Sequence, residues 1–407
     1  MQFYWSEKIL VVLIIILVAM AGVSFYLQDI KIIFFSQIAT VSDGSSGPLS
    51  GPIGTLSVPQ KLSNPPEIIK AVYVTGYSAG SKKYLDYLSN LFKTTEINAV
   101  VVDVKDYSGL VSYNSGADNA QKYKLYDHAI PDIDALVRFF HNQNVYVIGR
   151  IVVFEDPAFS KVRPDLAVYN KINTTDLSQP ILWQDNNKLS WLDPASKEVW
   201  DYNISLAKDA FYHGFDEVNF DYVRFPSDGK IGDMGFPAWD GKTAKSEVIK
   251  DFFNYVRQQL ASQKISVDLF GQTTISTDDM GIGQVIENAF ENFDFISPMV
   301  YPSHYANGFM GFDNPAEHPY EVIKYSMDTA LARQQTFNNL LLQNSEAADS
   351  TAKFRPWLQD FNMGAYYTAD MVKDEIRATQ DALGNDYNGF MLWNPSNVYT
   401  EEAVLPR

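Results

Sequence analysis

The feature that most constrains the fold is an eightfold alternation of short apolar, β-branched runs with helical stretches. The strand-like runs lie at residues 70–77, 97–106, 145–155, 215–225, 265–271, 294–301, 354–361 and 389–395. Runs that are apolar almost throughout and are separated by helices predict a parallel sheet covered on both faces. Eight such units fit an α/β fold of the (β/α)8, or TIM barrel, type with long loops.

The alternative for this pattern is an open, doubly wound sheet. Its nucleotide-binding version is disfavoured, because no GxGxxG motif follows the first run. Asp193 and Pro194 are typical of a helix start, as N-cap and first helical residue. After the eighth run only residues 396–407 remain, including "TEEAVLP", and this segment is too short for a full closing helix. The helices predicted between the runs span residues 81–92, 132–143, 193–214, 243–262, 281–291, 320–343 and 368–383.

The N-terminus predicts export. Residues 9–27 form an uncharged, apolar stretch of 19 residues, which is long enough for a membrane-spanning signal anchor. A cleaved signal peptide with small residues at 19–21, or a buried helix, are the alternatives. We therefore predict an anchor or signal segment at 1–41, a Ser/Gly/Pro-rich linker at 42–66 and the barrel at 67–407. The barrel is expected outside the cytoplasm, at the cell membrane or, after cleavage, extracellular.

Composition excludes several classes of function. The net charge of -17 argues against a nucleic-acid partner, because no excess of basic residues is available to neutralise phosphates. The absence of cysteine removes thiolate catalysis, Fe–S clusters and cysteine zinc sites. The five histidines show no metal-binding spacing, so we expect neither a metal nor another cofactor. An Asp-based calcium site in the loop 226–235 is the alternative.

Polar and aromatic side chains are concentrated at the ends of the strand-like runs. In a barrel the C-terminal ends of the strands carry the active site. Asn219 and Asp221 share one face of the fourth run, because side chains alternate along a strand. Asp103 and Lys105 share a face of the second run by the same rule. The residues expected at the barrel mouth are Asp103, Lys105, Arg150, Asn219, Asp221, Arg224, Asp268, Tyr301, His304, Gln359 and Trp393.

Two carboxyl groups that reach one cavity provide what glycoside hydrolysis requires, a nucleophile or base and a proton donor. Arg224 beside Asp221 would keep that carboxylate charged. Asp268, with fewer cationic neighbours, would be the proton donor. A purely structural role is the alternative for each of these residues. Asp221 would form an ion pair with Arg224, and Asp268 would anchor a loop. Asp103 and Lys105 would form a salt bridge at the barrel rim.

Taken together, these motifs resemble the family described as "putative glycoside hydrolase domain", found in bacterial and archaeal envelope proteins. The resemblance covers about residues 68–400 and includes "VVVDVKD", "GFDEVNFDYVRFPSDG", "DLFG", "ISPMVYPSHY", "RPWLQDF" and "GFMLWNPSN". It implies a barrel related to the α-amylase and α-galactosidase groups, a carbohydrate substrate, and Asp221 at the nucleophile position. Relatives take the acid from strand five, usually as Glu, or from strand six. Strand five here offers Asp268, and strand six offers Tyr301.

Other functions remain to be weighed against hydrolysis. The chitinase motif DxxDxDxE would place Asp216, Asn219 and Asp221 at its Asp positions, but Val223 replaces the catalytic Glu. The alternative from another class is a barrel that binds carbohydrate without cleaving it. Such a protein needs aromatic platforms but no correctly spaced acid. A metal-dependent deacetylase is disfavoured by the lack of a histidine-rich motif. The sequence thus predicts an extracytoplasmic glycoside hydrolase acting on a polysaccharide or oligosaccharide.

Overall fold

Eight parallel strands close into a barrel, as predicted. The computed structural model describes residues 60–343 and 352–406. Every neighbouring pair of barrel strands is parallel, and β11 pairs with β1 to close the sheet. The barrel strands are β1 (Ile69–Val74), β2 (Ala99–Lys105), β3 (Tyr146–Val152), β5 (Glu217–Asp221), β7 (Ile265–Phe270), β8 (Phe295–Met299), β9 (Lys353–Phe354) with β10 (Trp357–Gln359), and β11 (Gly389–Trp393). A two-stranded antiparallel sheet joins β4 (Tyr169–Asn170) to β6 (Met234–Gly235) in loops beyond the barrel.

The seventh strand is interrupted. β9 and β10 both pair with β8, and residues 355 and 356 lie between them. Residue 356 is a proline, whose missing N–H breaks the regular ladder of hydrogen bonds. The two short strands therefore count as one strand of the barrel, and the open doubly wound sheet is ruled out.

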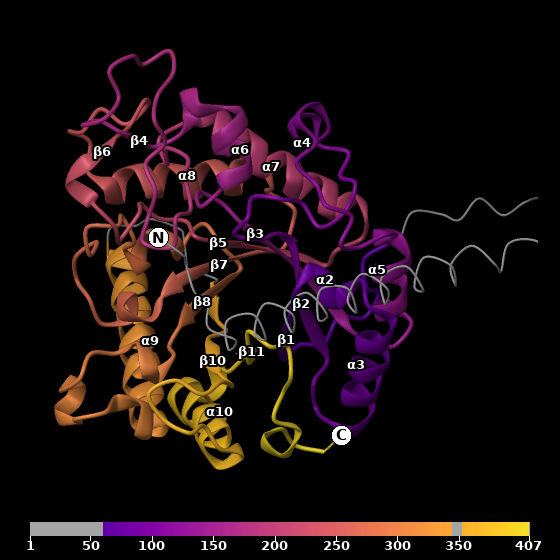
Figure 1. Ribbon diagram of the computed structural model, residues 1–407. Helices are drawn as coiled ribbons and strands as arrows, with labels where there is room; N and C mark the ends of the chain where they lie inside the picture. Colours follow the sequence, from indigo (N-terminus) through magenta and orange to yellow (C-terminus); the bar gives the residue numbers. More distant parts are fainter. Residues whose placement is uncertain (1–59, 344–351, 407) are drawn as a thin grey trace, which may run out of the picture. The chain divides into compact units, whose positions relative to one another are not determined.

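Helices surround the strands (Figure 1) and bury their apolar faces against them. α9 and α10 lie side by side. The α-helices are α2 (Gly76–Ala79), α3 (Lys82–Thr94), α4 (Asp118–Tyr123), α5 (Ile133–His141), α6 (Pro157–Val162), α7 (Lys197–Tyr212), α8 (Lys245–Gln259), α9 (Pro319–Gln343) and α10 (Ala369–Leu383). Those expected near 81–92, 132–143, 243–262, 320–343 and 368–383 are confirmed.

One predicted helix is not formed, and the helix predicted over 193–214 is present but starts later than expected. Over 281–291 only a 3-10 helix forms, at Ile286–Ala289, because Gly281 and Gly283 turn the chain with positive φ angles of 70° and 89°. α7 begins at Lys197 rather than at residue 194. Asp193 is not its N-cap: the Asp193 carboxylate accepts the backbone N–H groups of residues 195, 238 and 239, and so ties two loops together.

The N-terminal predictions fall on residues that the structure does not describe. The anchor at 9–27 and most of the linker lie before residue 60. Among the described residues, no helix combines the length and the apolar character needed to cross a bilayer. The domain boundaries at 41 and 66 stay predictions.

The lower half of the barrel interior contains a buried ion pair. Glu217 on β5 and Arg355, between β9 and β10, are both fully buried and pair directly. Glu217 also accepts hydrogen bonds from Ser266 (2.6 Å) and Tyr146 (3.2 Å). The Arg355 guanidinium lies 4.1 Å from the centre of the Phe295 ring. Removing either charge would leave the other buried without a counter-charge.

We expect Arg355→Met to reduce the free energy of unfolding by about 3–5 kcal/mol, because it strands the Glu217 carboxylate in the barrel interior. Adding Glu217→Gln should recover most of that loss. Chemical denaturation of the two variants measures both effects. Lys82→Met, which breaks the exposed pair with Asp86 on α3, is the control and should leave the unfolding midpoint nearly unchanged. Equal destabilisation by the single and double variants would contradict this account.

Candidate active site

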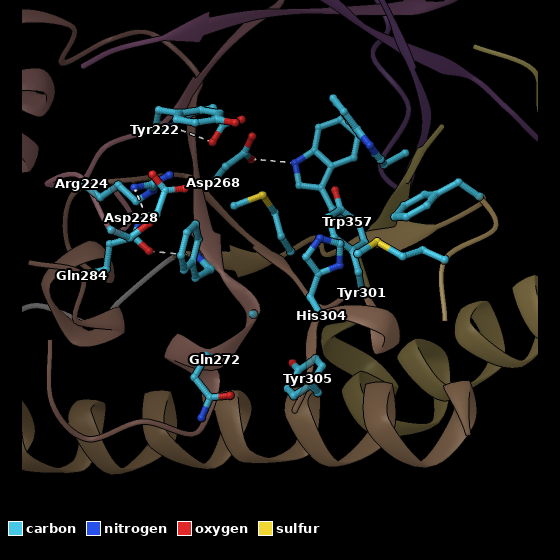
Figure 2. A pocket seen from close by; sticks show the side chains of 18 of the residues that line it. Tyr222, Arg224, Asp228, Asp268, Gln272, Gln284, Tyr301, His304, Tyr305 and Trp357 are labelled. Atoms are coloured by element: carbon cyan, nitrogen blue, oxygen red, sulfur yellow. Dashed lines mark hydrogen bonds between the residues drawn. The ribbon is translucent and has the colours of Figure 1, made fainter. Parts of the chain in front are cut away.

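A cleft of about 590 Å³ opens at the C-terminal ends of the barrel strands. Six strands contribute to its floor and walls, and the loops that follow β5, β7, β8 and β10 form its rim. Figure 2 shows Asp268 between two sides of this cleft, with Arg224 and Asp228 on one side and Tyr301 and His304 on the other. The strand residues that line it are Arg150 (β3), Asp221 (β5), Asp268 and Phe270 (β7), Met299 (β8), Trp357 (β10) and Trp393 (β11).

Arg150 fixes the position of Asp221. Its Nε and Nη2 donate to the same carboxylate oxygen of Asp221, at 3.0 and 2.7 Å. Its Nη1 donates to Asp103 at 2.6 Å, and Asp103 also accepts a hydrogen bond from the Tyr73 hydroxyl. The other Asp221 oxygen accepts the backbone N–H of Tyr222 at 2.6 Å. The Asp221 carboxylate is thus held in one orientation with a cation beside it.

Tyr222 reaches this position through an unusual backbone conformation. Its φ angle is 53°, in the left-handed region that bulky side chains rarely adopt. The turn brings the Tyr222 N–H back onto the carboxylate of the residue before it. Residue 222 therefore contributes to the site through its backbone as well as its ring.

Asp268 has the opposite environment. It is 1% exposed, and its Oδ1 accepts hydrogen bonds from Asn219 and Trp357, both at 2.8 Å. Its Oδ2 is buried without a hydrogen-bond partner among the described residues. Burial, followed by the negative charge of Asp221, raises the pKa of Asp268 well above its usual value. Both causes favour the protonated form of Asp268.

The two carboxyl groups lie on neighbouring strands at matching heights. Asn219 pairs in register with Ser266, so the residues two further along, Asp221 and Asp268, are also opposite each other. Asp221 is paired with a cation, whereas the surroundings of Asp268 favour its protonated form. A charged carboxylate beside a carboxyl group that favours its protonated form can supply both a base or nucleophile and a general acid.

Most of the residues predicted at the barrel mouth lie together in this cleft. Tyr301 and His304 approach it from the loop after β8, and Trp393 stacks on Tyr73 with ring centres 4.1 Å apart. Burial lowers the pKa of His304, which is therefore neutral. The predicted residues that line the cleft are Arg150, Asp221, Arg224, Asp268, Tyr301, His304 and Trp393.

Lys105 does not face the cleft. A shift of register in β2 between Asp103 and Lys105 replaces the alternation that the prediction assumed. Lys105 points instead to the layer between strands and helices, where it is fully buried and pairs with Asp156 at 2.6 Å. The rim salt bridge between Asp103 and Lys105 is also absent, because Asp103 pairs with Arg150.

Three further expectations need correction. Arg224 does not form the ion pair with Asp221; Arg150 does. Asn219 is fully buried beneath the cleft, where it donates to Ser266 and Asp268. Gln359 is also buried and links the loops after β8 and β10 through the backbone of residues 303 and 361. Asn219 and Gln359 therefore support the site from below, as Asp103 does through Arg150.

Loop residues were missed by sequence reasoning. Glu155, just beyond β3, is 5% exposed, and burial followed by the negative charge of Asp185 raises its pKa to about 8. The terminal Glu of "VYVIGRIVVFE" was a signal that could have pointed to it. No sequence pattern pointed to the remaining residues, because loop conformations do not follow a periodic arrangement of apolar and polar residues. Unpredicted loop residues that line the cleft include Tyr222, Ser227, Asp228, Gln272, Gln284, Phe361 and Met363.

Comparisons with known proteins identify the family of the chain. A family model described as "Putative glycosyl hydrolase domain" matches residues 71–399. The glycoside hydrolase domain of PgaB (BpsB) from Bordetella bronchiseptica is 13% identical, with 81% of this chain and 95% of that chain covered and a TM-score of 0.50. This likeness shows a shared fold. No curated protein matches the chain.

Two other solved structures are similar. A hypothetical protein from Ruminiclostridium thermocellum is 37% identical, with 52% of this chain and 98% of that chain covered and a TM-score of 0.44. The α-galactosidase TtGalA from Thermus thermophilus is 13% identical, with 84% of this chain and 61% of that chain covered and a TM-score of 0.46.

The raised pKa of Asp268 makes stability depend on pH. Its folded-state pKa lies above the unfolded value of about 3.9, so the folded state loses stability as pH rises from there. Asp268→Asn keeps the Oδ1 acceptor and removes this loss. We therefore expect the variant to gain stability relative to the wild type as pH rises from about 4 to 7. Denaturant unfolding at several pH values measures the difference.

Asp294→Asn is a control of opposite sign. Although burial opposes it, hydrogen bonds from Arg257, the Ile265 N–H and Lys264 lower the pKa of Asp294. Its stabilising contribution is present above the unfolded pKa and is lost as pH falls. The Asn variant should therefore be less stable than the wild type at pH 7, with a smaller deficit at acidic pH. Parallel pH profiles for the two variants would contradict the environment described for Asp268.

Proposed function

Because this chain belongs to the family described as "putative glycosyl hydrolase domain", we propose that it cleaves glycosidic bonds in a polysaccharide with Asp221 as nucleophile and Asp268 as acid and base. The observation that carries the proposal is the contrast between two neighbouring carboxyl groups in one cleft. Asp221 is paired with Arg150, and burial raises the pKa of Asp268, which favours its protonated form. Glycoside hydrolysis needs one carboxyl group in each of these states.

Each group has a defined part in the reaction. Asp268 donates its proton to the glycosidic oxygen as the bond from that oxygen to the anomeric carbon breaks. Asp221 attacks the anomeric carbon, and Arg150 stabilises its charge before the attack. Asp268, now deprotonated, accepts a proton from the water that releases the sugar. The hydrogen bonds of Asn219 and Trp357 both go to one Asp268 oxygen, so the other oxygen has no partner among the described residues.

Aromatic side chains support a carbohydrate substrate. Trp357 and Trp393 meet edge to face, with ring centres 5.9 Å apart, and both line the cleft. Tyr301 and Phe361 form a second such pair at 5.7 Å. Sugar rings present apolar C–H faces that pack against aromatic rings. The cleft thus combines apolar platforms with a few polar groups, as ligand sites commonly do.

Asp221→Asn should lower kcat by at least about a thousandfold, because the nucleophile is lost. Asp268→Asn should lower it by roughly 10²- to 10⁴-fold on a polysaccharide. The loss should be much smaller on an aryl glycoside whose leaving group needs no protonation. Release of reducing sugar from a panel of polysaccharides, and of phenolate from aryl glycosides, measures these effects.

Asp251→Asn is the matched control, since Asp251 is exposed on α8 and away from the cleft. It should keep wild-type activity. Full activity of Asp221→Asn would refute the assignment. A wild-type protein that binds glycans but cleaves none would favour the non-catalytic carbohydrate-binding barrel.

We also propose that the barrel works outside the cytoplasm, on a cell-surface or environmental polysaccharide. The proposal is supported by the apolar stretch at 9–27 and by the Ser/Gly/Pro-rich segment at 42–66, which would separate a membrane anchor from the barrel. The aromatic platforms suit long, hydrated substrates of this kind.

The full chain should sediment with membranes, whereas a chain that begins at residue 60 should not and should keep its activity. Replacing Ile14 and Ile15 with Lys should release the full chain, because two charges in the centre of the apolar stretch oppose insertion. Fractionation with protease protection tests both statements. N-terminal sequencing separates an uncleaved anchor from a cleaved signal. Full protection of the barrel inside intact cells would contradict export.

A further inference from the structure

Arg224 is a buried cation in the wall of the cleft. It follows β5, is 8% exposed and lines the cleft (Figure 2). Its guanidinium lies over the rings of Trp191 and Phe270, 4.7 Å from each ring centre, and 5.2 Å from that of Tyr222. Flat aromatic contacts of this kind hold the side chain in one place without neutralising its charge.

Only one of its three nitrogens donates a hydrogen bond within the part of the chain that the structure describes. Nη1 donates to the Phe225 carbonyl (3.2 Å) and to the Ser227 hydroxyl (3.1 Å). Nε and Nη2 have no partner there, and neither is sealed from solvent as two nitrogens of Arg355 are. Nε and Nη2 lie on one edge of the guanidinium, and this edge can bind a carboxylate through two parallel hydrogen bonds. Arg150 uses the same edge to hold Asp221.

No carboxylate among the described residues neutralises Arg224. Asp221 is bound to Arg150, and Glu155 does not reach ion-pair distance. Burial raises the pKa of Glu155 to about 8, so that group is largely uncharged at neutral pH. Asp228 is exposed and accepts a backbone N–H of the loop at residue 186. A buried charge without a counter-charge is unfavourable unless a ligand supplies one.

We infer that the sugar bound beside Asp221 carries an anionic substituent, which Arg224 binds through Nε and Nη2. This inference rests on the proposed function, because it concerns the substrate of the same cleft. A planar uronic acid carboxylate fits the two-nitrogen edge best. A sulfate or phosphate ester shares the charge but lacks the planar match.

Binding of monosaccharides in matched pairs tests the inference independently of turnover. The probes are glucuronate and galacturonate against glucose and galactose, with glucose 6-sulfate and glucose 6-phosphate as the other anions. Calorimetric titration of the wild-type chain should show that an anionic probe binds about tenfold or more tightly than its neutral partner. The preference should weaken as salt is added. The tightest anion identifies the substituent as carboxylate, sulfate or phosphate.

Two variants in the same loop should change the preference for the anionic probe in opposite directions. Arg224→Gln should abolish the preference for the anionic probe while binding of neutral sugars changes little. Asp228→Asn removes a negative charge from the same wall and should increase the preference. Asp228 is exposed, so that variant should fold even if Arg224→Gln is unstable, which a thermal melt would reveal. Asp251→Asn on α8 should leave the preference unchanged.

The inference is overturned if no anionic probe is preferred, or if Asp228→Asn leaves the preference unaltered. Cleavage of neutral polysaccharides without any anionic preference would refute the inference and leave the proposed hydrolase intact. Anionic preference in a protein that cleaves nothing would leave the inference intact and refute the hydrolase.

Discussion

The site depends on the ion pairs that the Arg150 guanidinium forms with Asp103 and Asp221. The guanidinium is nearly buried at the top of the barrel and joins carboxylates from two other strands, Asp103 on β2 and Asp221 on β5. Without Arg150, two acidic groups would face each other in a poorly solvated space, and ionising both would be costly. The pairing places a cation directly beside the Asp221 carboxylate in the cleft. It also fixes the position of the Asp221 carboxylate relative to Asp268 on β7.

The contrast between Asp221 and Asp268 follows from how each carboxyl group is coordinated. Asp221 receives a cation and a backbone N–H, whereas Asp268 receives two neutral donors and no cation. The same residue type therefore serves two chemical purposes on adjacent strands. Both groups are buried, so the cation beside Asp221 is what distinguishes them. The aromatic walls of the cleft contribute to acid–base chemistry as well as to contact with a sugar.

The sequence was sufficient to predict the barrel and much of the cleft. Strands that are buried on both faces are largely apolar, so their number and order can be recognised from composition. The polar residues late in each run, such as Asp221 on β5, marked the C-terminal ends of the strands. The partner of Asp221 was not predictable. It depends on the stagger between β3 and β5, which no local pattern encodes. Lys105 was misplaced because one extra residue in β2 reverses the facing of all that follow. Glu155 and Tyr222 depend on loop geometry, which tertiary contacts decide.

The left-handed backbone at Tyr222 limits which residues this position can accept. For a side chain with a Cβ atom, that conformation costs about 1–2 kcal/mol relative to the ordinary helical region. A β-branched residue would pay more, since its second branch crowds the carbonyl, whereas Gly or Asn would relax the turn. The ring that lies beside Arg224 is therefore retained against a local preference for smaller residues. Position 222 should therefore tolerate substitution by residues that readily adopt a positive φ, such as Gly and Asn, but not by Val, Ile or Thr.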